Sequence, residues 1–265
     1  MTNDSVLGPA FPEFGWVPAP RYLMRRNRIL ALTDRTPPGH LLEIGPGAGT
    51  LLVEFARKGF RCEALESSVE ARETVAKIAG AARVDIDVHA EADAGWRGRF
   101  DCVFAFDVLE HIEDDRAALA QWVSWLRQGG TLVLSVPARM SLWTAGDEWA
   151  GHFRRYERDA LKALVEAAGL RIERFECYGF PLTNITEKAS APLYRRAIHA
   201  RSGSREVDRQ RNNDRSGTDR RLHMRMFNVM RSWFGTSVMR MFYGVQSLFL
   251  QRDIGSGYIL LARVP

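Results

Sequence analysis

Hydrophobic residues occur in short runs that alternate with segments of helical periodicity. The short apolar runs predict strands at residues 40–44, 61–65, 84–89, 100–106, 131–136, 170–178 and 257–264. Apolar residues at spacings of three and four predict helices between them, at residues 20–34, 50–58, 69–78, 115–126 and 158–168. This alternation predicts an α/β fold, a Rossmann-like, seven-stranded, mostly parallel sheet with helices on both faces.

Two segments do not follow the alternation. The first 37 residues form an arm with aromatic anchors and no regular period, which ends in one cap helix. About 75 residues separate the last two predicted strands. We therefore divide the chain into an N-terminal arm with its cap helix (1–37), a core (38–180), an insertion (181–254) and a final core strand (255–265).

The composition is that of a globular protein, with 46% hydrophobic and 26% charged residues. The net charge of +5 comes from one segment, residues 195–225, which hold ten arginines against four acidic residues. Few apolar residues interrupt this segment between 195 and 221, which predicts a mobile loop. Three cysteines without metal-like spacing predict buried, reduced thiols. With no signal-peptide pattern at the first residues, we expect a cytoplasmic protein.

A glycine loop follows the first core strand. Gly45, Gly47 and Gly49 lie between that strand and a helix, where glycines allow close approach of a ligand to the backbone and to the helix N-terminus. A dinucleotide loop requires a glycine at position 50, which is Thr50 here. Glu43 precedes the first glycine by two residues.

Acidic residues follow the next three strands. Glu66 is placed to bind a ribose diol, Asp93 to accept from an adenine amine, and Asp107 to lie at the edge where ligands of such sheets bind. Each also has a structural alternative. Glu43 could be an ordinary strand-end residue, and the others could be a helix-start charge, a turn residue and a cap, in that order.

The runs LLEIGPGAGT, FDCVFAFDVLEHI and LRQGGTLVLSVPA resemble the class I S-adenosylmethionine-dependent methyltransferases, most closely the small-molecule and quinone or lipid subgroup. The resemblance covers residues 38–178 and 257–264. It implies the strand order 3-2-1-4-5-7-6 with the last strand antiparallel, and S-adenosyl-L-methionine as cofactor.

The resemblance also implies a role for each matching residue. Around the methionine part and sulfonium it places Glu43, Gly45, Gly47, Gly49, Asp107, Val108 and Leu109. It places Glu66 on the ribose, and Asp93 with Ala94 beside the adenine.

Two histidines are the candidate catalytic residues. His111 follows the fourth strand, and His152 lies in a polar and aromatic loop after the fifth. An imidazole titrates near neutrality and suits a general base for a hydroxyl acceptor. The alternative for His111 is packing at a helix start.

Three further residues are candidate substrate contacts: Arg154 and Tyr156 beside His152, and Tyr22 of the cap helix, which we expect to cover the cofactor cleft. The alternative for Arg154 is a solvated pair with Arg155. A divalent cation could use the spacing of Asp107, Glu110 and His111, with His152 completing the site, as in some similar methyltransferases, but we assign no metal.

The insertion contains an amphipathic stretch at residues 224–250, rich in Met and aromatic residues. It predicts a lid helix over the active site, and the alternative is peripheral membrane contact. The run D-V-L-E after the fourth strand differs from the motif of nucleobase methyltransferases and argues against nucleobase N-methylation. Chemistry on RNA phosphate or ribose stays open, although we do not expect a nucleic-acid partner. Oligomeric state stays open.

Together these features predict an enzyme that methylates O or N of a small, partly apolar or lipid-like acceptor by in-line displacement. One alternative is a non-catalytic methyltransferase-like protein that docks RNA or membrane through its basic insertion. The other, an NAD(P)-dependent oxidoreductase, is disfavoured by Thr50 and by the lack of a Tyr-x-x-x-Lys pair.

Overall fold

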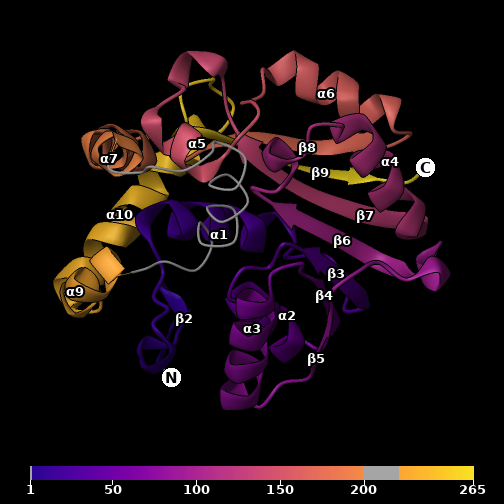
Figure 1. Ribbon diagram of the computed structural model, residues 1–265, viewed down its shortest axis with the longest axis horizontal. Helices are drawn as coiled ribbons and strands as arrows, with labels where there is room; N and C mark the ends of the chain where they lie inside the picture. Colours follow the sequence, from indigo (N-terminus) through magenta and orange to yellow (C-terminus); the bar gives the residue numbers. More distant parts are fainter. Residues whose placement is uncertain (1, 200–220) are drawn as a thin grey trace.

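The computed structural model describes residues 2–199 and 221–265. Most of the loop predicted at 195–221 lies outside these residues, and its first part is the end of a helix. The fold is a three-layer α/β arrangement in which the sheet runs through the centre (Figure 1).

The central sheet has seven strands in the order β5-β4-β3-β6-β7-β9-β8. Counted from β3 as the first core strand, this is the predicted order 3-2-1-4-5-7-6. β9 is antiparallel to both neighbours, and the other neighbouring pairs are parallel. The strands are β3 His40–Ile44, β4 Arg61–Leu65, β5 Ile86–His89, β6 Phe100–Phe106, β7 Leu126–Pro137, β8 Arg171–Tyr178 and β9 Gly257–Arg263.

Helices cover both faces of the sheet. Leu119 and Trp122 of α4 and Leu161 of α6 belong to the hydrophobic cluster on one face. On the other face, α1 and α2 pack against Leu41 and Phe104. The bounds are α1 Pro20–Leu32, α2 Thr50–Arg57, α3 Val69–Ala82, α4 Asp115–Trp125 and α6 Arg158–Ala167. These faces follow from the strand pattern, because successive residues of a buried strand point to opposite sides.

The arm differs from the prediction of an irregular segment. Its first residues form a hairpin, in which β1 (Thr2–Asp4) pairs with β2 (Gly8–Ala10). The Asp4 carboxylate accepts hydrogen bonds from the backbone N–H of Val6 and Leu7 at 2.7 and 3.0 Å, which closes the turn. Of the aromatic anchors, Phe11 and Trp16 are buried, whereas Phe14 is exposed.

The insertion also differs from the prediction. The single helix expected at 224–250 is two helices, α9 (Arg221–Met230) and α10 (Trp233–Phe249). Ser232 interrupts them because its side chain caps α10 by accepting from the Gly235 N–H at 3.2 Å. A third helix, α7 (Leu182–His199), has no counterpart in the prediction. No helix among the described residues is long and apolar enough to cross a membrane.

The arm and the insertion pack against each other. Tyr243 of α10 donates to the Val6 carbonyl at 2.9 Å, and Gln246 donates to the Met24 carbonyl at 3.1 Å. Phe227 and Met239 are buried in the same hydrophobic cluster as the apolar face of α1. Residues from both ends of the chain therefore cover one face of the sheet together. The three cysteines are buried and unpaired, as predicted.

Candidate active site

Four loops that carry the predicted cofactor residues meet at the carboxyl edge of the sheet. They follow β5, β4, β3 and β6, which are consecutive in the sheet. Backbone hydrogen bonds join the strand ends: Gly45 N–H donates to the Leu65 carbonyl and Glu66 N–H to the His89 carbonyl, both at 2.9 Å. The predicted residues therefore lie at one edge, although they are separated by up to about 60 positions in the chain.

The glycine loop has the backbone conformation that its sequence requires. Gly45, Gly47 and Gly49 have φ of 61°, 57° and 70°, in the left-handed region that favours glycine. A Cβ on Gly45 would lie 2.7 Å from a methyl group of Val108. α2 begins at Thr50 without a side-chain cap, so its first N–H groups face the loop.

Glu43 is buried beneath this loop, with 4% of its surface exposed. Its Oε2 has no hydrogen-bond partner among the described residues. Burial raises the pKa of Glu43 to about 8, against the smaller opposing effect of Arg25. The buried oxygen, the uncapped helix start and the glycines provide polar groups that fit the methionine part of the implied cofactor.

Glu66 and Asp93 each make a local hydrogen bond. Glu66 Oε1 accepts from the Ser68 N–H at 2.9 Å, at the start of α3. Asp93 Oδ1 accepts from the Gly95 N–H at 2.6 Å, and Ala94 beside it is exposed. In this structure Glu66 therefore lies as a helix-start charge and Asp93 as a turn residue, which are their structural alternatives. Ribose and adenine binding stay predictions for these residues.

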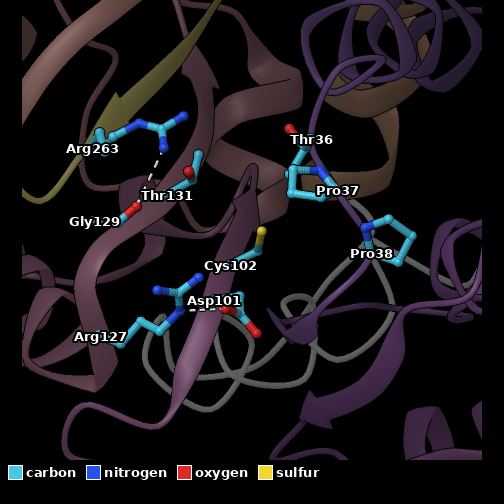
Figure 2. Close-up of a pocket in the computed structure, with 9 residues that line it drawn as sticks. All are labelled: Thr36, Pro37, Pro38, Asp101, Cys102, Arg127, Gly129, Thr131 and Arg263. Atoms are coloured by element: carbon cyan, nitrogen blue, oxygen red, sulfur yellow. Dashed lines mark hydrogen bonds and ion pairs between the residues drawn. The ribbon is translucent and has the colours of Figure 1, made fainter.

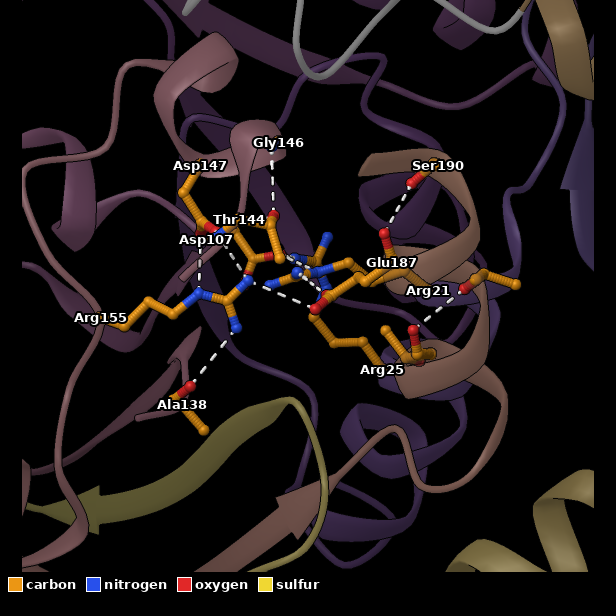
Figure 3. Close-up of polar contacts among 12 residues, drawn as sticks. Arg21, Arg25, Asp107, Ala138, Thr144, Gly146, Asp147, Arg155, Glu187 and Ser190 are labelled. Carbon is orange, nitrogen blue, oxygen red and sulfur yellow. Dashed lines mark hydrogen bonds and ion pairs between the residues drawn. The ribbon is translucent and has the colours of Figure 1, made fainter. Parts of the chain in front are cut away.

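Asp107 lies at the centre of a charged cluster (Figure 3). It follows β6 with φ of 56°, which is uncommon for a residue other than glycine. Its Oδ2 pairs with Arg21 at 3.2 Å and with Arg25, both from α1, and its Oδ1 accepts from Ser135 at 3.2 Å. Burial would raise the pKa of Asp107, but the two arginines lower it to about 2. The two residues after Asp107 lie in different surroundings. Val108 lies against Gly45 of the glycine loop, and Leu109 is buried in the core.

α1 lies over the glycine loop as well as over Asp107. The Tyr22 hydroxyl is 3.1 Å from the Thr50 hydroxyl, and its ring packs edge-on against Trp16. The cap helix is thus at the cofactor edge, where it was expected. Tyr22 reaches the start of α2, and a substrate contact stays a prediction for it.

The two candidate histidines lie side by side. The ring centroids of His111 and His152 are 4.6 Å apart with the rings at 84°. Glu110 beside them is fully buried, and burial raises its pKa well above the usual range. His152 Nε2 is 3.9 Å from Glu110 Oε1. One atom from each of the three lies within 4.8 Å of the others, a spacing that could hold a divalent cation.

Arg154 and Tyr156 contact α4. Arg154 Nη1 and the Tyr156 hydroxyl both bind the Asp115 carboxylate, at 2.8 and 3.0 Å, and Tyr156 is buried. They fix the loop of His152 to the core in this structure, and substrate contact remains a prediction. Arg155 is not the solvated partner that the alternative assumed, because only 4% of it is exposed.

Sequence reasoning missed the residues that join this loop to α1. Arg155 binds Asp147 of α5 (Ala145–Ala150) through two hydrogen bonds, at 2.8 and 2.9 Å, and Glu187 of α7 at 3.3 Å. Glu187 also pairs with Arg21 (Figure 3). The dense charges of residues 147–155 were a signal for this loop, but its partners on α1 and α7 are distant in sequence.

A small cavity of 90 Å³ lies at the opposite edge of the sheet (Figure 2). It is lined by residues at the amino ends of β6 and β7, among them Asp101, Arg127 and Thr131. None of the predicted site residues lines it. Its volume is also below the several hundred Å³ that small-molecule sites usually have, so we place the active site at the carboxyl edge.

Comparison with known proteins agrees with this geometry. Residues 19–174 match the family model described as a methyltransferase domain, so the chain belongs to that family. It is an S-adenosylmethionine-dependent methyltransferase, with S-adenosylmethionine as the methyl donor of this class.

Several relatives carry the name ubiquinone biosynthesis O-methyltransferase. The protein of Xanthomonas axonopodis pv. citri is 28% identical over 173 residues, which cover 58% of this chain and 72% of the relative. That of Xanthomonas campestris pv. campestris (strain B100) is 30% identical over 147 residues, which cover 51% and 62%.

Solved structures share the fold over most of the chain. The [4+2]-cyclase SpnF aligns with a TM-score of 0.60 and 17% identity, covering 92% of this chain and 82% of SpnF. A putative sarcosine dimethylglycine methyltransferase from Galdieria sulphuraria aligns with a TM-score of 0.57 and 12% identity, covering 99% and 94%.

The glycine loop gives a direct test of cofactor binding. Gly47→Arg should abolish binding of S-adenosylhomocysteine in calorimetry, because a bulky side chain at a φ of 57° would block close approach of the ligand to the loop backbone. Gly98→Arg is the matched control, since Gly98 also has a positive φ (65°) but open space around it. Equal affinities in the two variants would contradict the placement.

Glu43 predicts a pH dependence of stability. Its folded pKa of about 8 lies above the ordinary value of 4.5, so its stabilising effect is present below pH 4.5 and is lost as pH rises towards 8. The unfolding free energy of Glu43→Gln should therefore rise relative to that of the unmodified protein as the pH increases. The difference between the two proteins should be about 2 kcal/mol larger at pH 8 than at pH 5. Urea denaturation without cofactor measures this. The exposed control Glu166→Gln should show no such gain. If the unfolding free energies of Glu43→Gln and the unmodified protein changed with pH in parallel, the raised pKa of Glu43 would be refuted.

Proposed function

We propose that the protein O-methylates a hydroxyl group of a small, partly apolar acceptor, with His152 as the general base and His111 beside it. The observation that carries this proposal is the histidine pair beside Asp107, at the edge where the cofactor loops meet. The names of the relatives support oxygen as the acceptor atom and a quinone-like ring as the class.

When bound, S-adenosylmethionine supplies an electrophilic methyl group on its sulfonium. His152 would accept the proton of the acceptor hydroxyl as that oxygen takes the methyl group and the C–S bond breaks, and it would then release the proton to solvent. The protein's own contribution is therefore orientation of the acceptor and removal of one proton.

Activity on a catechol probe tests the proposal. His152→Gln should lower kcat about 100-fold, because it removes the general base. The affinity for S-adenosylhomocysteine should stay unchanged, because the substitution does not alter the cofactor loops. His40→Gln is the control, since His40 lies at the amino end of β3 and contacts Glu63. His111→Gln, tested in parallel, measures the share of the second histidine.

A metal-dependent reaction would give a different result. If Glu110, His111 and His152 held a divalent cation, chelation with EDTA would abolish turnover and Mg²⁺ or Zn²⁺ would restore it. Turnover that survives EDTA, together with loss in His152→Gln, is the result that we expect.

We also propose that residues 224–250 contact an anionic membrane surface in the cytoplasm. Three features support this: six exposed apolar side chains on α9 and α10, arginines between them, and no acidic residue from 221 to 252. The apolar side chains are Met226, Val229, Trp233, Phe234, Met241 and Leu248. The unpaired cysteines support the cytoplasm as the compartment.

Liposome sedimentation tests the membrane contact. The protein should pellet with vesicles of phosphatidylcholine and phosphatidylglycerol, and less with phosphatidylcholine alone. The double variant Trp233→Ser/Phe234→Ser should lose the binding, because it removes the most exposed aromatic pair. Ile185→Ser on α7 is the matched control, being 58% exposed on another helix. Binding unchanged in the double variant would place the contact elsewhere.

A further inference from the structure

The loop of His152 is built around a buried carboxylate. Asp147 lies in the first turn of α5, where it accepts from the Thr144 N–H at 2.7 Å and from the Thr144 hydroxyl at 3.1 Å. Gly151 then takes a φ of 78° and ends the helix. The reversal brings the His152 N–H to the Asp147 carbonyl at 3.0 Å, so the two side chains lie next to each other.

Asp147 makes more contacts than a helix cap requires. The capping box of α5 requires of the Asp147 side chain only its hydrogen bond from the Thr144 N–H. The carboxylate additionally accepts from His152 Nδ1 at 3.0 Å and from two nitrogens of Arg155, and both members of that ion pair are almost completely buried. A buried ion pair is weak evidence for stability, because desolvation offsets the attraction. The extra partners therefore point to a task other than holding α5.

The hydrogen bonds from His152 and Arg155 keep the carboxylate ionised. Burial would raise the pKa of Asp147, but the hydrogen bonds from His152 and Arg155 lower it well below its usual range. An ionised carboxylate can only accept hydrogen bonds. His152 Nδ1 must therefore be the donor, and in the neutral imidazole the lone pair lies on Nε2.

The lone pair then points towards the active site. His152 Nε2 lies 3.9 Å from Glu110 Oε1, and Glu110 follows Asp107 by three residues. A neutral imidazole with this tautomer is ready to accept a proton, and the resulting imidazolium would be stabilised by Asp147.

We propose that Asp147 is a positioning residue that fixes the tautomer and orientation of His152, and that Arg155 holds Asp147 in place. The proposal deepens the proposed function, because it rests on His152 as the base. Its structural part, which nitrogen carries the proton, can be measured without any turnover.

Asp147→Asn is the decisive variant. The Asn oxygen can still accept from Thr144, but its amide can donate to Nδ1, which would force the proton onto Nε2. We expect kcat to fall about 100-fold, with KM and the affinity for S-adenosylhomocysteine within about twofold of the unmodified protein. Asp114→Asn is the matched control, since Asp114 caps α4 with no histidine on it, and should keep full kcat.

Imidazole ¹⁵N spectra of the full-length protein read the tautomer directly. His152→Gln identifies the His152 signals by their loss. In the unmodified protein, the neutral ring should carry its proton on Nδ1, and in Asp147→Asn on Nε2. Arg155→Lys keeps the charge but loses the two-point contact, so a smaller fall in kcat of about tenfold is expected even if Asp147→Asn folds poorly.

The outcomes separate the two proposals. A proton on Nε2 in the unmodified protein, or an unchanged kcat in Asp147→Asn together with a moved proton, overturns the positioning role. Full activity in His152→Gln overturns the base assignment of the proposed function, while the spectra still decide whether Asp147 fixes the ring.

Discussion

The architecture of the active site depends on a chain of alternating charges across separate elements. It runs from Asp107 through Arg21, Glu187 and Arg155 to Asp147. Each link joins a different part of the molecule: a core strand end, the arm, the insertion and the loop of His152. Because a buried charge without a partner is costly, each element holds its neighbour in place. The arm and the insertion are therefore parts of the site as well as its cover.

The sequence predicts the sheet well because its signals are local. Short apolar runs, the glycine loop and the acidic strand ends each lie within a few residues, and the parallel topology places them at one edge. The carboxylates that follow β4, β5 and β6 are thus found without coordinates. The prediction of β7 was shorter than the strand, because Gly129 and Gly130 were interpreted as the end of the preceding helix, whereas β7 already begins at Leu126.

The remaining parts depend on contacts between distant residues. Nothing near Arg155 shows that Glu187 will neutralise it from another helix, so the pair Arg154 and Arg155 resembles a solvated face. The hairpin at residues 2–10 likewise depends on one aspartate that closes its turn. The break at Ser232 was missed because the apolar spacing continues through it, although serine is a good N-cap.

The shared packing of the arm and the insertion has a consequence for how the chain folds during synthesis. Val6, Leu23 and Met24 leave the ribosome early, but they share a cluster with Phe227 and Met239, which emerge some 200 residues later. Until then, the apolar face of the first helix has no complete cover. Such non-local contacts slow folding and expose aggregation-prone surface. Until α9 and α10 have been translated, this apolar face of the nascent polypeptide is open to non-native association.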